Sequence, residues 1–439
     1  MLKLDLSPLH KIAQKHGLKP TDIRAQQKQL GGYLKEIQKK DQGFCEILDD
    51  QKTLRDIEIY AKKAKGKYEF IVVLGIGGSA LGASCLAESL ASSEGADPHP
   101  RTKKVPTLFV LDNIDPSQIS NIGSRIDLRR TLFIVITKSG NTPETMATYL
   151  YFRAAIDRKK LSPRTHFVFI TDPKKGFLRF IGDREGIPSF SIPPNVIGRF
   201  SVLTPVGLLP AALLGINIRA LIRGAQKMRA QFLSKNSDTN LPFQLATVQY
   251  LMSEKEKSAH VLIPYSSRLI RFADWVRQLV AESTGKEKKW LHRTLNVGIT
   301  LINALGVTDQ HSQFQLYNQG PNDKLIMFIK VAKMGPSIRI PPLYEEEESL
   351  ECLHKKTFQQ MMHAEMEASQ KALIKNDRPS FTIEIDRVDE EHLGMLFMLF
   401  QGATAFLGEF FDINAFNQPG VALGKELTRA ILSVHSNHQ

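Results

Sequence analysis

The strongest constraint on the fold is a set of short apolar runs that are not interrupted by polar residues. Four such runs lie in the first half of the chain: Phe70–Leu74, Thr107–Leu111, Leu132–Ile136 and His166–Thr171. An unbroken apolar run is typical of a strand that is covered on both faces. Helical patterns such as Leu81–Leu90 lie between some of the runs. This alternation predicts an α/β fold, with a parallel sheet and helices on both of its faces.

A second set of elements follows the polar segment Ser234–Asn240. We expect its strands and helices, in turn, at Ala259–Pro264, Leu325–Ala332 and Phe381–Ile385, and at Leu269–Val280, His354–Leu373 and Glu390–Phe410. Helical spacing is also present before Lys65 and from about Gly420 to Ser433. The sequence therefore predicts two doubly wound parallel-sheet domains. The expected division is 1–65 (N-terminal helical segment), 66–233 (first sheet domain), 234–412 (second sheet domain) and 413–439 (C-terminal loop and helix).

Charge and hydropathy exclude several classes of protein. The formal net charge is +13, but the basic residues are dispersed and no basic stretch is interleaved with stacking aromatics, so we do not expect nucleic-acid binding. A positive balance also suits a small anionic substrate. The apolar stretch Leu393–Phe411 carries Gln401 and Glu409, which favours a buried helix over a membrane span. The N-terminus lacks a secretory pattern, so we expect a soluble, cytoplasmic protein that binds no membrane.

Two turns rich in glycine and hydroxyl residues follow strands of the first sheet, at Gly75–Gly82 and Thr137–Thr145. A helix N-terminus has unpaired N–H groups and a positive dipole end, and Ser or Thr adds short donors, so such a turn can hold an anion. The alternative for the second turn is an ordinary capping box, Thr142-x-x-Thr145. Taken alone, that turn is consistent with both interpretations.

The first turn also fits the dinucleotide fingerprint G-x-G-x-x-A. That fingerprint needs an acidic residue at the end of the next strand, and Glu94 has about the right spacing but lies in a Ser/Gly-rich loop. Ser79, beside the bare amides of Gly77 and Gly78, suits a phosphate monoester at least as well. We therefore favour a sugar phosphate over NAD as the ligand of this turn.

Together the two turns resemble the first sugar-isomerase (SIS) domain of the glucose-6-phosphate isomerase family. The resemblance implies two SIS domains and a phosphate pocket built from both turns. Carried over by position, the residues of this pocket are Gly78, Ser79, Thr137, Lys138, Ser139, Thr142 and Thr145.

Four further stretches resemble the same family and occur in its order. Gly198–Gly207 is similar to G-G-R-[FY]-S, Gln278–Lys286 to Q-x-x-x-E-S-x-G-K, Thr308–Gln315 to Q-H-x-x-x-Q, and Phe416–Lys425 to F-D-Q-x-G-V-E-x-x-K. The length of the chain is most similar to that of the shorter bacterial members. The resemblance implies reversible interconversion of D-glucose 6-phosphate and D-fructose 6-phosphate, a step of glycolysis and gluconeogenesis.

The resemblance also implies a role for each site residue. Glu282 is expected to move a proton between the two reacting carbons through a cis-enediol, with Gln278 as a polar substrate contact one helical turn away. His311 and Lys425 are expected to assist ring opening, since imidazole titrates near neutral pH. Arg199 is expected to stabilise the negative charge that develops on the enediol.

The family places its active site at a dimer interface, so the resemblance implies a homodimer in which the partner subunit supplies His311. No cofactor and no metal are expected, because no cluster of His, Cys, Asp or Glu has metal-ligand spacing. Three positions depart from the family pattern. Ile197 stands in place of Gly, which is a poor fit if that position needs a positive φ. Asn417 replaces Asp, and Ala422 replaces Glu.

Two other functions remain compatible with these motifs. A sugar-phosphate-binding SIS protein without catalysis would use the two turns and leave Glu282, His311 and Lys425 idle. An isomerase that also accepts mannose 6-phosphate would use all of them.

Overall fold

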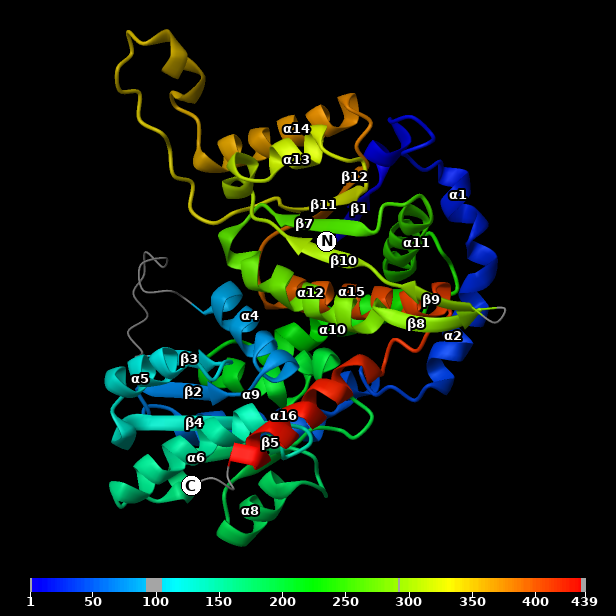
Figure 1. Ribbon diagram of the computed structural model, residues 1–439. Helices are drawn as coiled ribbons and strands as arrows, with labels where there is room; N and C mark the ends of the chain where they lie inside the picture. The colour runs from blue at the N-terminus through cyan, green and yellow to red at the C-terminus, as the bar shows by residue number, and fades with distance from the viewer. Residues whose placement is uncertain (1, 92–104, 291–292, 436–439) are drawn as a thin grey trace.

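Two open α/β sheets lie one above the other in the computed structural model (Figure 1), which describes residues 2–91, 105–290 and 293–435. The first sheet is entirely parallel and has the order β3-β2-β4-β5-β6. Its strands are β2 (Phe70–Leu74), β3 (Thr107–Leu111), β4 (Thr131–Ile136), β5 (Phe167–Thr171) and β6 (Ser189–Ser191). The helices connecting them are α4 (Leu81–Leu90), α5 (Pro116–Arg125), α6 (Pro143–Arg158), α7 (Pro163–His166) and α8 (Phe177–Glu185).

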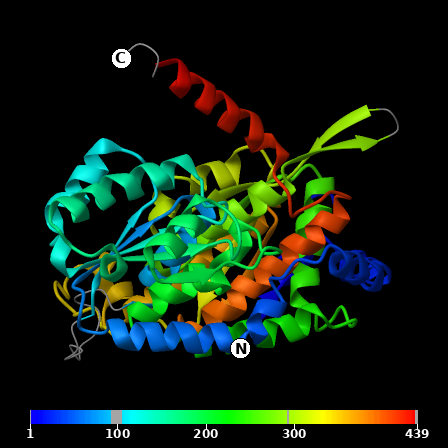
Figure 2. The same cartoon turned by 90° about the horizontal axis from the view of Figure 1, so that it is seen from below.

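The second sheet has the order β1-β12-β11-β7-β10, and only β1 runs antiparallel to its neighbour. Its strands are β1 (Lys3–Asp5), β7 (Ala259–Pro264), β10 (Thr300–Asn303), β11 (Lys324–Val331) and β12 (Ser380–Ile385). A separate hairpin, β8 (Lys286–Trp290) with β9 (Arg293–Val297), projects from the body (Figure 2). The remaining helices are α1 (Pro20–Ala25), α2 (Gln27–Lys39), α3 (Gln51–Ala64), α9 (Pro205–Leu213), α10 (Ile218–Phe232), α11 (Leu241–Glu254), α12 (Ile270–Thr284), α13 (Phe314–Gln319), α14 (Phe358–Lys375), α15 (Glu390–Phe410) and α16 (Ala422–His435).

Both sheets are covered on both faces, as the unbroken apolar runs predict. In β4, Leu132 and Ile134 face one core cluster, whereas Phe133 and Val135 face another. The same alternation occurs in β11. Met327 belongs to the first cluster, whereas its neighbours Ile326 and Phe328 belong to a third cluster. A strand has a side-chain period of two, so two apolar layers require apolar residues at every position. The predicted α/β fold with two mainly parallel sheets is confirmed.

The two halves share one continuous core around α15. This helix is long and apolar enough to cross a membrane, but 94% of its apolar window is buried inside the protein. It packs closely on α10 because glycines face the partner backbone. A Cβ at Gly224 would lie 1.8 Å from the Glu391 carbonyl oxygen, and one at Gly394 would lie 1.9 Å from that of Leu221. Larger side chains at either position would separate the two helices.

The sequence-based prediction was wrong in three places, one of which concerns the site. The first residues form the edge strand β1 and not only helices, because the short run Lys3–Asp5 can pair with β12. Helix α12 continues beyond Val280 to Thr284, so Glu282 lies in its last turn. Helix α14 begins at Phe358 and not at His354, because Thr357 and Gln360 form a capping box there. Strands β6 and β10 and the hairpin were not predicted.

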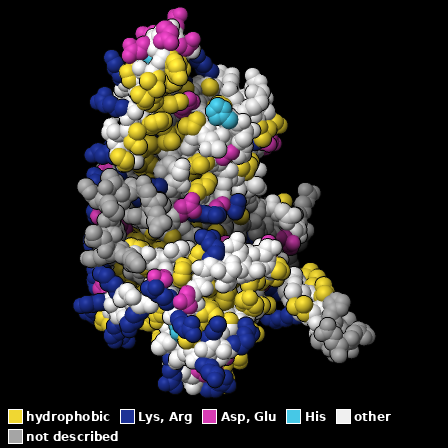
Figure 3. All heavy atoms as spheres, turned by 90° about the vertical axis from the view of Figure 1, so that its left-hand side faces the viewer, with side chains coloured by type: hydrophobic (Ala, Val, Ile, Leu, Met, Phe, Trp, Pro, Cys, Tyr) yellow, Lys and Arg dark blue, Asp and Glu magenta, His cyan; other side chains and the backbone are white. Residues whose placement is uncertain are grey.

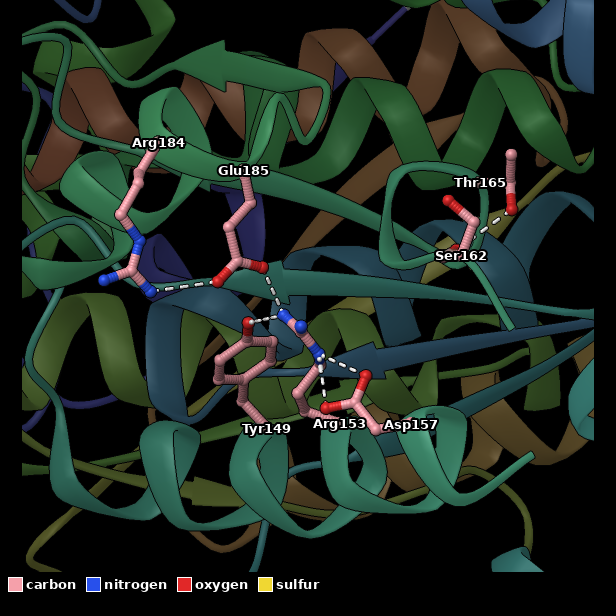
Figure 4. Close-up of polar contacts among 7 residues, drawn as sticks. All are labelled: Tyr149, Arg153, Asp157, Ser162, Thr165, Arg184 and Glu185. Atoms are coloured by element: carbon pink, nitrogen blue, oxygen red, sulfur yellow. Dashed lines mark hydrogen bonds and ion pairs between the residues drawn. The ribbon is translucent and has the colours of Figure 1, made fainter. Parts of the chain in front are cut away.

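Helix α6 is held against α8 by an ion-pair cluster (Figure 4). Arg153 bonds Asp157 one turn along α6, at 3.0 Å, and also contacts Glu185 at the end of α8. Arg184 lies 3.0 Å from the same Glu185. Since the N-terminus of α6 follows the turn Thr137–Thr142, this cluster helps to fix the direction in which that turn faces.

The connection between β11 and α14 is a long loop (residues 332–357) that projects from the second sheet (Figure 1). Acidic side chains gather at its tip and apolar side chains lie beside them (Figure 3). Among the latter, Leu343 and Tyr344 are 62% and 69% exposed.

A buried histidine should make the fold sensitive to acid. His260 on β7 is fully buried, and burial lowers the pKa of its imidazole to about 3. The unfolded chain therefore binds this proton more readily, and stability should fall as pH drops from about 6.5 toward 3, by about 1.4 kcal/mol per pH unit. Between pH 7 and pH 5, urea unfolding of the wild type should lose about 2 kcal/mol more than His260→Gln. Substitution of exposed His10 by Gln serves as the control, and equal losses in wild type and His260→Gln would contradict the prediction.

Candidate active site

The two hydroxyl-rich turns lie side by side at the carboxyl edge of the first sheet. Leu74 pairs with Val135, so the residues that follow β2 and β4 are neighbours. A Cβ at Gly75 would lie 3.3 Å from the Ile136 carbonyl oxygen, a tight contact that shows how closely the chains after β2 and β4 approach. Strands β2 and β4 also flank the point where the strand order reverses. In doubly wound sheets, ligands bind in the crevice at that point.

Three hydroxyl groups converge in the second turn. The Thr137 and Thr142 hydroxyl oxygens are 2.7 Å apart, and that of Ser139 is 3.3 Å from both. Thr142 is the N-cap residue of α6, yet its side chain does not cap the helix. The capping-box alternative for Thr142 and Thr145 is therefore not formed. Instead, the hydroxyls gather where the dipole of α6 is positive.

Thr145 has a buried hydroxyl group that lacks a hydrogen-bond partner in this turn. It is only 2% exposed, and its hydroxyl has no hydrogen-bond partner among the described residues. Buried hydroxyls are nearly always bonded in native proteins. An anion with several acceptor oxygens, bound at the start of α6, could accept a hydrogen bond from this hydroxyl.

The first turn brings a second polar group to the same edge. Gly77–Ser79 forms a 3-10 turn (η3) just before α4, and the Ser79 hydroxyl makes no side-chain hydrogen bond within the described chain. Gly78 packs directly on the chain that leads to Arg199. A Cβ at Gly78 would lie 2.3 Å from the Gly198 carbonyl, so a larger residue would displace this segment.

Lys138 links the second turn to the same segment. Its ammonium group donates to the carbonyls of Pro194 and Val196, at 2.7 and 2.9 Å, and burial lowers its pKa. In the structure, Lys138 therefore holds the loop before Arg199, rather than lying free at the hydroxyl cluster.

Arg199 is the most connected side chain of the site. It is the second residue of the 3-10 turn η5 (Gly198–Leu203) and is 2% exposed. Its five polar contacts are to the Ser283 hydroxyl (2.7 Å), the Gln418 side-chain oxygen (3.0 Å), the Ala415 and Asn417 carbonyls (2.7 and 3.0 Å) and a Glu282 carboxylate oxygen (3.2 Å). Burial lowers its pKa and the Glu282 carboxylate opposes that shift, but a guanidinium stays charged in proteins.

Glu282 is held at both carboxylate oxygens. One oxygen faces Arg199, and the other accepts a hydrogen bond from the Gln278 amide at 3.2 Å, one turn earlier on α12. The shared helix face expected from the four-residue spacing is confirmed. The Glu282 side chain is still 27% exposed, and the other amide atom of Gln278 is buried without a partner among the described residues. This carboxylate can therefore reach a ligand while its direction is fixed.

Two predicted residues do not join this cluster. His311 ends the 3-10 turn η7 (Thr308–His311) and is exposed, and Lys425 lies on α16, where every described side chain is exposed. Neither side chain has a hydrogen bond or an ion pair within the described chain. Within one chain, the structure brings together Arg199, Gln278, Glu282 and the two turns, and leaves His311 and Lys425 apart from them.

The departures from the family pattern have little effect on this geometry. Ile197 has φ −80° and ψ 159°, an extended conformation that suits a β-branched residue, so the strain anticipated for a positive φ is absent. Asn417 contacts Arg199 through its backbone carbonyl, which any residue would supply. Ala422 is the first residue of α16 and is exposed.

Sequence reasoning missed three residues of the site: Ser283, Gln418 and Lys286. Ser283 and Gln418 bond Arg199 directly, and the Lys286 ammonium donates to the Glu282 carbonyl at 2.6 Å. All three lie within motif stretches that the sequence singled out, so their position in those stretches was the available signal. Lys286 and Asn417 also line a cavity of about 920 Å³ between the hairpin and residues 412–420.

The described residues contain no group of three or more His, Cys, Asp or Glu side chains that could hold a metal ion. Glu94, which the dinucleotide alternative requires, lies outside the described residues.

Comparison with known proteins identifies close relatives over almost the whole chain. The family model described as "Phosphoglucose isomerase" matches residues 46–439. A glucose-6-phosphate isomerase of Carboxydothermus hydrogenoformans is 38% identical over 98% of this chain and 94% of its own length, and one of Thermus thermophilus is 37% identical over 89% and 90%.

Solved structures agree with the sequence comparison. A hypothetical protein of Thermus thermophilus superposes with a TM-score of 0.89 at 34% identity, covering 98% of this chain and all of that chain. A glucose-6-phosphate isomerase of Chlamydia trachomatis gives a TM-score of 0.77 at 26% identity, over 88% and 74% of the two chains.

Removal of the unpartnered hydroxyl should weaken anion binding without weakening the fold. We expect Thr145→Val to raise the Kd for inorganic phosphate about fivefold to tenfold, since one hydrogen bond is worth about 1 kcal/mol. Titration calorimetry would measure this Kd, and urea unfolding would measure stability. Thr148→Val on the same helix is the control, because its hydroxyl already bonds the Glu144 and Thr145 carbonyls. An unchanged Kd in Thr145→Val would contradict the phosphate site.

Proposed function

The chain belongs to the phosphoglucose isomerase family, and we propose that it interconverts D-glucose 6-phosphate and D-fructose 6-phosphate with Glu282 as the catalytic base. The observation that carries this assignment is the Glu282 carboxylate, held between Arg199 and Gln278 beside two turns suited to a phosphate. The enzyme is soluble, since the one membrane-length apolar helix among its described residues lies in the core. We propose that it acts in the cytoplasm.

The turns hold the end of the sugar that does not react. Ser79, Thr137, Ser139, Thr142 and Thr145 donate hydrogen bonds to the phosphate, and the positive end of the α6 dipole adds to the attraction. Gly78 lets the phosphate approach backbone amides. Lys138 adds positive charge close to the pocket while it anchors the loop that carries Arg199. Binding energy at this end positions the reacting carbons at the other.

The reaction then needs one base that reaches two neighbouring carbons. Glu282 takes the proton from C2 of the open-chain aldose and returns it to C1, while a proton passes from the C2 hydroxyl to the C1 carbonyl oxygen. Before the C1 oxygen is protonated, the intermediate is a cis-enediolate with negative charge on oxygen. The fixed guanidinium of Arg199 stabilises that charge without moving, because its five contacts already hold it in place.

Ring opening precedes this step and requires a proton at the ring oxygen. We assign that role to His311, with Lys425 at the sugar hydroxyls. Neither residue makes a hydrogen bond or an ion pair with Glu282 within the described chain, so we propose a homodimer in which the partner subunit supplies His311. Helix α16 supports this arrangement. It projects from the body (Figure 2) and exposes Leu423, Leu427 and Ile431 along one face, by 64%, 52% and 60%. A helix of this length is barely stable alone in water, and such an apolar face marks an interface.

We further propose that residues 66–233 and 234–412 act as two units. The first holds the phosphate, and the second supplies Gln278, Glu282 and His311. Residues 1–65 form a separate N-terminal segment, and residues 413–439 form the C-terminal segment, in which Ala415, Asn417 and Gln418 bond Arg199.

Turnover of fructose 6-phosphate tests the function directly. Wild type should form glucose 6-phosphate, followed through a coupled dehydrogenase, and Glu282→Gln should lower kcat by about 10²- to 10⁴-fold, since it removes the base. Glu287→Gln, an exposed carboxylate on the adjacent hairpin, is the control and should keep its activity. Binding of fructose 6-phosphate with no proton exchange at C1 in heavy water would instead identify a non-catalytic binding protein. Parallel assays with mannose 6-phosphate would reveal a broader specificity.

Mixing of two inactive variants tests the dimer. A heterodimer of Glu282→Gln with His311→Ala has one site with both changes and one with neither, if His311 acts across the interface. Co-refolded variants should then recover up to about half of the wild-type turnover per heterodimer. If His311 acts within its own chain, each site carries one change and no activity returns. Each variant alone, at the same total concentration, is the control.

A further inference from the structure

The end of helix α12 is an unfavourable place for a carboxylate. Glu282 lies in the last turn, where the helix dipole is negative and backbone carbonyls lack partners within the helix. A positive group at this end would offset both effects. Arg199 faces the Glu282 side chain but makes no contact with the backbone of the last turn.

Lys286 supplies that positive group. Its ammonium donates to the Glu282 carbonyl oxygen at 2.6 Å, four residues back along the chain. The preceding carbonyls are bonded locally, that of Val280 by the Thr284 hydroxyl and that of Ala281 by the Gly285 amide. The Glu282 carbonyl is thus the one in this turn that a charged side chain satisfies.

The backbone of Lys286 belongs to a different element. It is the first residue of β8 and pairs with Val297 of β9, at the base of the projecting hairpin. The Ile299 amide donates to the Thr284 hydroxyl, which adds a second link between the two elements. The side chain of Lys286 therefore joins the catalytic end of α12 to the base of the hairpin.

We propose that Lys286 is a positioning residue for the isomerisation, and that its ammonium ties the last turn of α12 to the hairpin base and so fixes the direction of the Glu282 carboxylate. This inference rests on the proposed function of Glu282. It assigns Lys286 no contact with the substrate.

The charge of Lys286 is set by its surroundings. Burial, together with the positive charge of Arg199, lowers its pKa to about 8, whereas the Glu282 carboxylate opposes the shift. The neutral amine, present above about pH 8, is a weaker donor and no longer offsets the helix dipole. We therefore expect kcat to fall as pH rises through this range.

The same titration has the opposite effect on stability. The folded pKa lies below that of the unfolded chain, so between about pH 8 and 10.5 the unfolded state binds more protons. This group's contribution to stability then rises with pH. A fall in kcat above pH 8 would therefore not reflect unfolding caused by Lys286.

Three variants test the proposal by kcat and KM between pH 6.5 and 10. Lys286→Met should lower kcat about tenfold or more, with KM changed less than threefold, because a small misplacement of a catalytic group is costly. Lys286→Arg keeps the positive charge and should recover most of kcat. The fall of kcat at alkaline pH should then move above about pH 9 in this variant. Lys288→Met, on the same strand, removes an ammonium that bonds the Phe411 carbonyl and lies 3.7 Å from the Asp412 carboxylate, and should stay within twofold of wild type.

The proposal is wrong if kcat of Lys286→Met stays within twofold of the wild-type value, or if Lys288→Met loses as much kcat as Lys286→Met. It is also wrong if kcat of Lys286→Arg still falls with rising pH near pH 8. Should Lys286→Met fail to fold, the pH profile of Lys286→Arg decides. Amide hydrogen exchange over residues 278–286 provides a readout that needs no turnover. Faster exchange in Lys286→Met than in Lys288→Met supports the tie, and equal exchange excludes it. If the wild type is inactive but amide exchange is still faster in Lys286→Met than in Lys288→Met, the proposed function is contradicted and the tie between Lys286 and α12 is not.

Discussion

The buried guanidinium of Arg199 is the interaction on which the site depends. A charge so far from water is stable only where every donor is bonded, and here the acceptors come from α12, which carries Ser283 and Glu282, and from the segment before α16. Three stretches that are distant in the sequence therefore meet because one side chain needs all of them. The same contacts fix the guanidinium before any substrate arrives, so no reorganisation is needed when negative charge develops.

Much of the fold could be predicted from local pattern. The central strands have apolar residues at every position because two cores meet them, and this signal placed β2, β3 and β4 to within one residue. The turns after β2 and β4 could be paired because parallel strands end at one edge of a sheet. Strands β1, β6 and β10 were missed because edge strands are short and only partly buried, so their apolar pattern is weak.

The candidate site was predictable in its residues but less so in its contacts. The motifs located Glu282 and Gln278, and the helical period explained their shared face. Nothing local in the sequence indicated that Lys138 would bond the carbonyls of Pro194 and Val196, or that Ile197 would adopt an extended conformation, because both depend on how distant loops pack. The partners of Arg199 were missed for the same reason.

Strand β1 has a consequence for how the chain is made. Lys3–Asp5 are synthesised well before their partner in β12, Ser380–Ile385. The first sheet is encoded entirely within residues 70–191, so it can close while synthesis continues. The second sheet must wait, since its edge pairing joins Lys3–Asp5 to a strand far along the sequence and has a very high contact order. During translation Lys3–Asp5 therefore have no strand to pair with until Ser380–Ile385 have been synthesised.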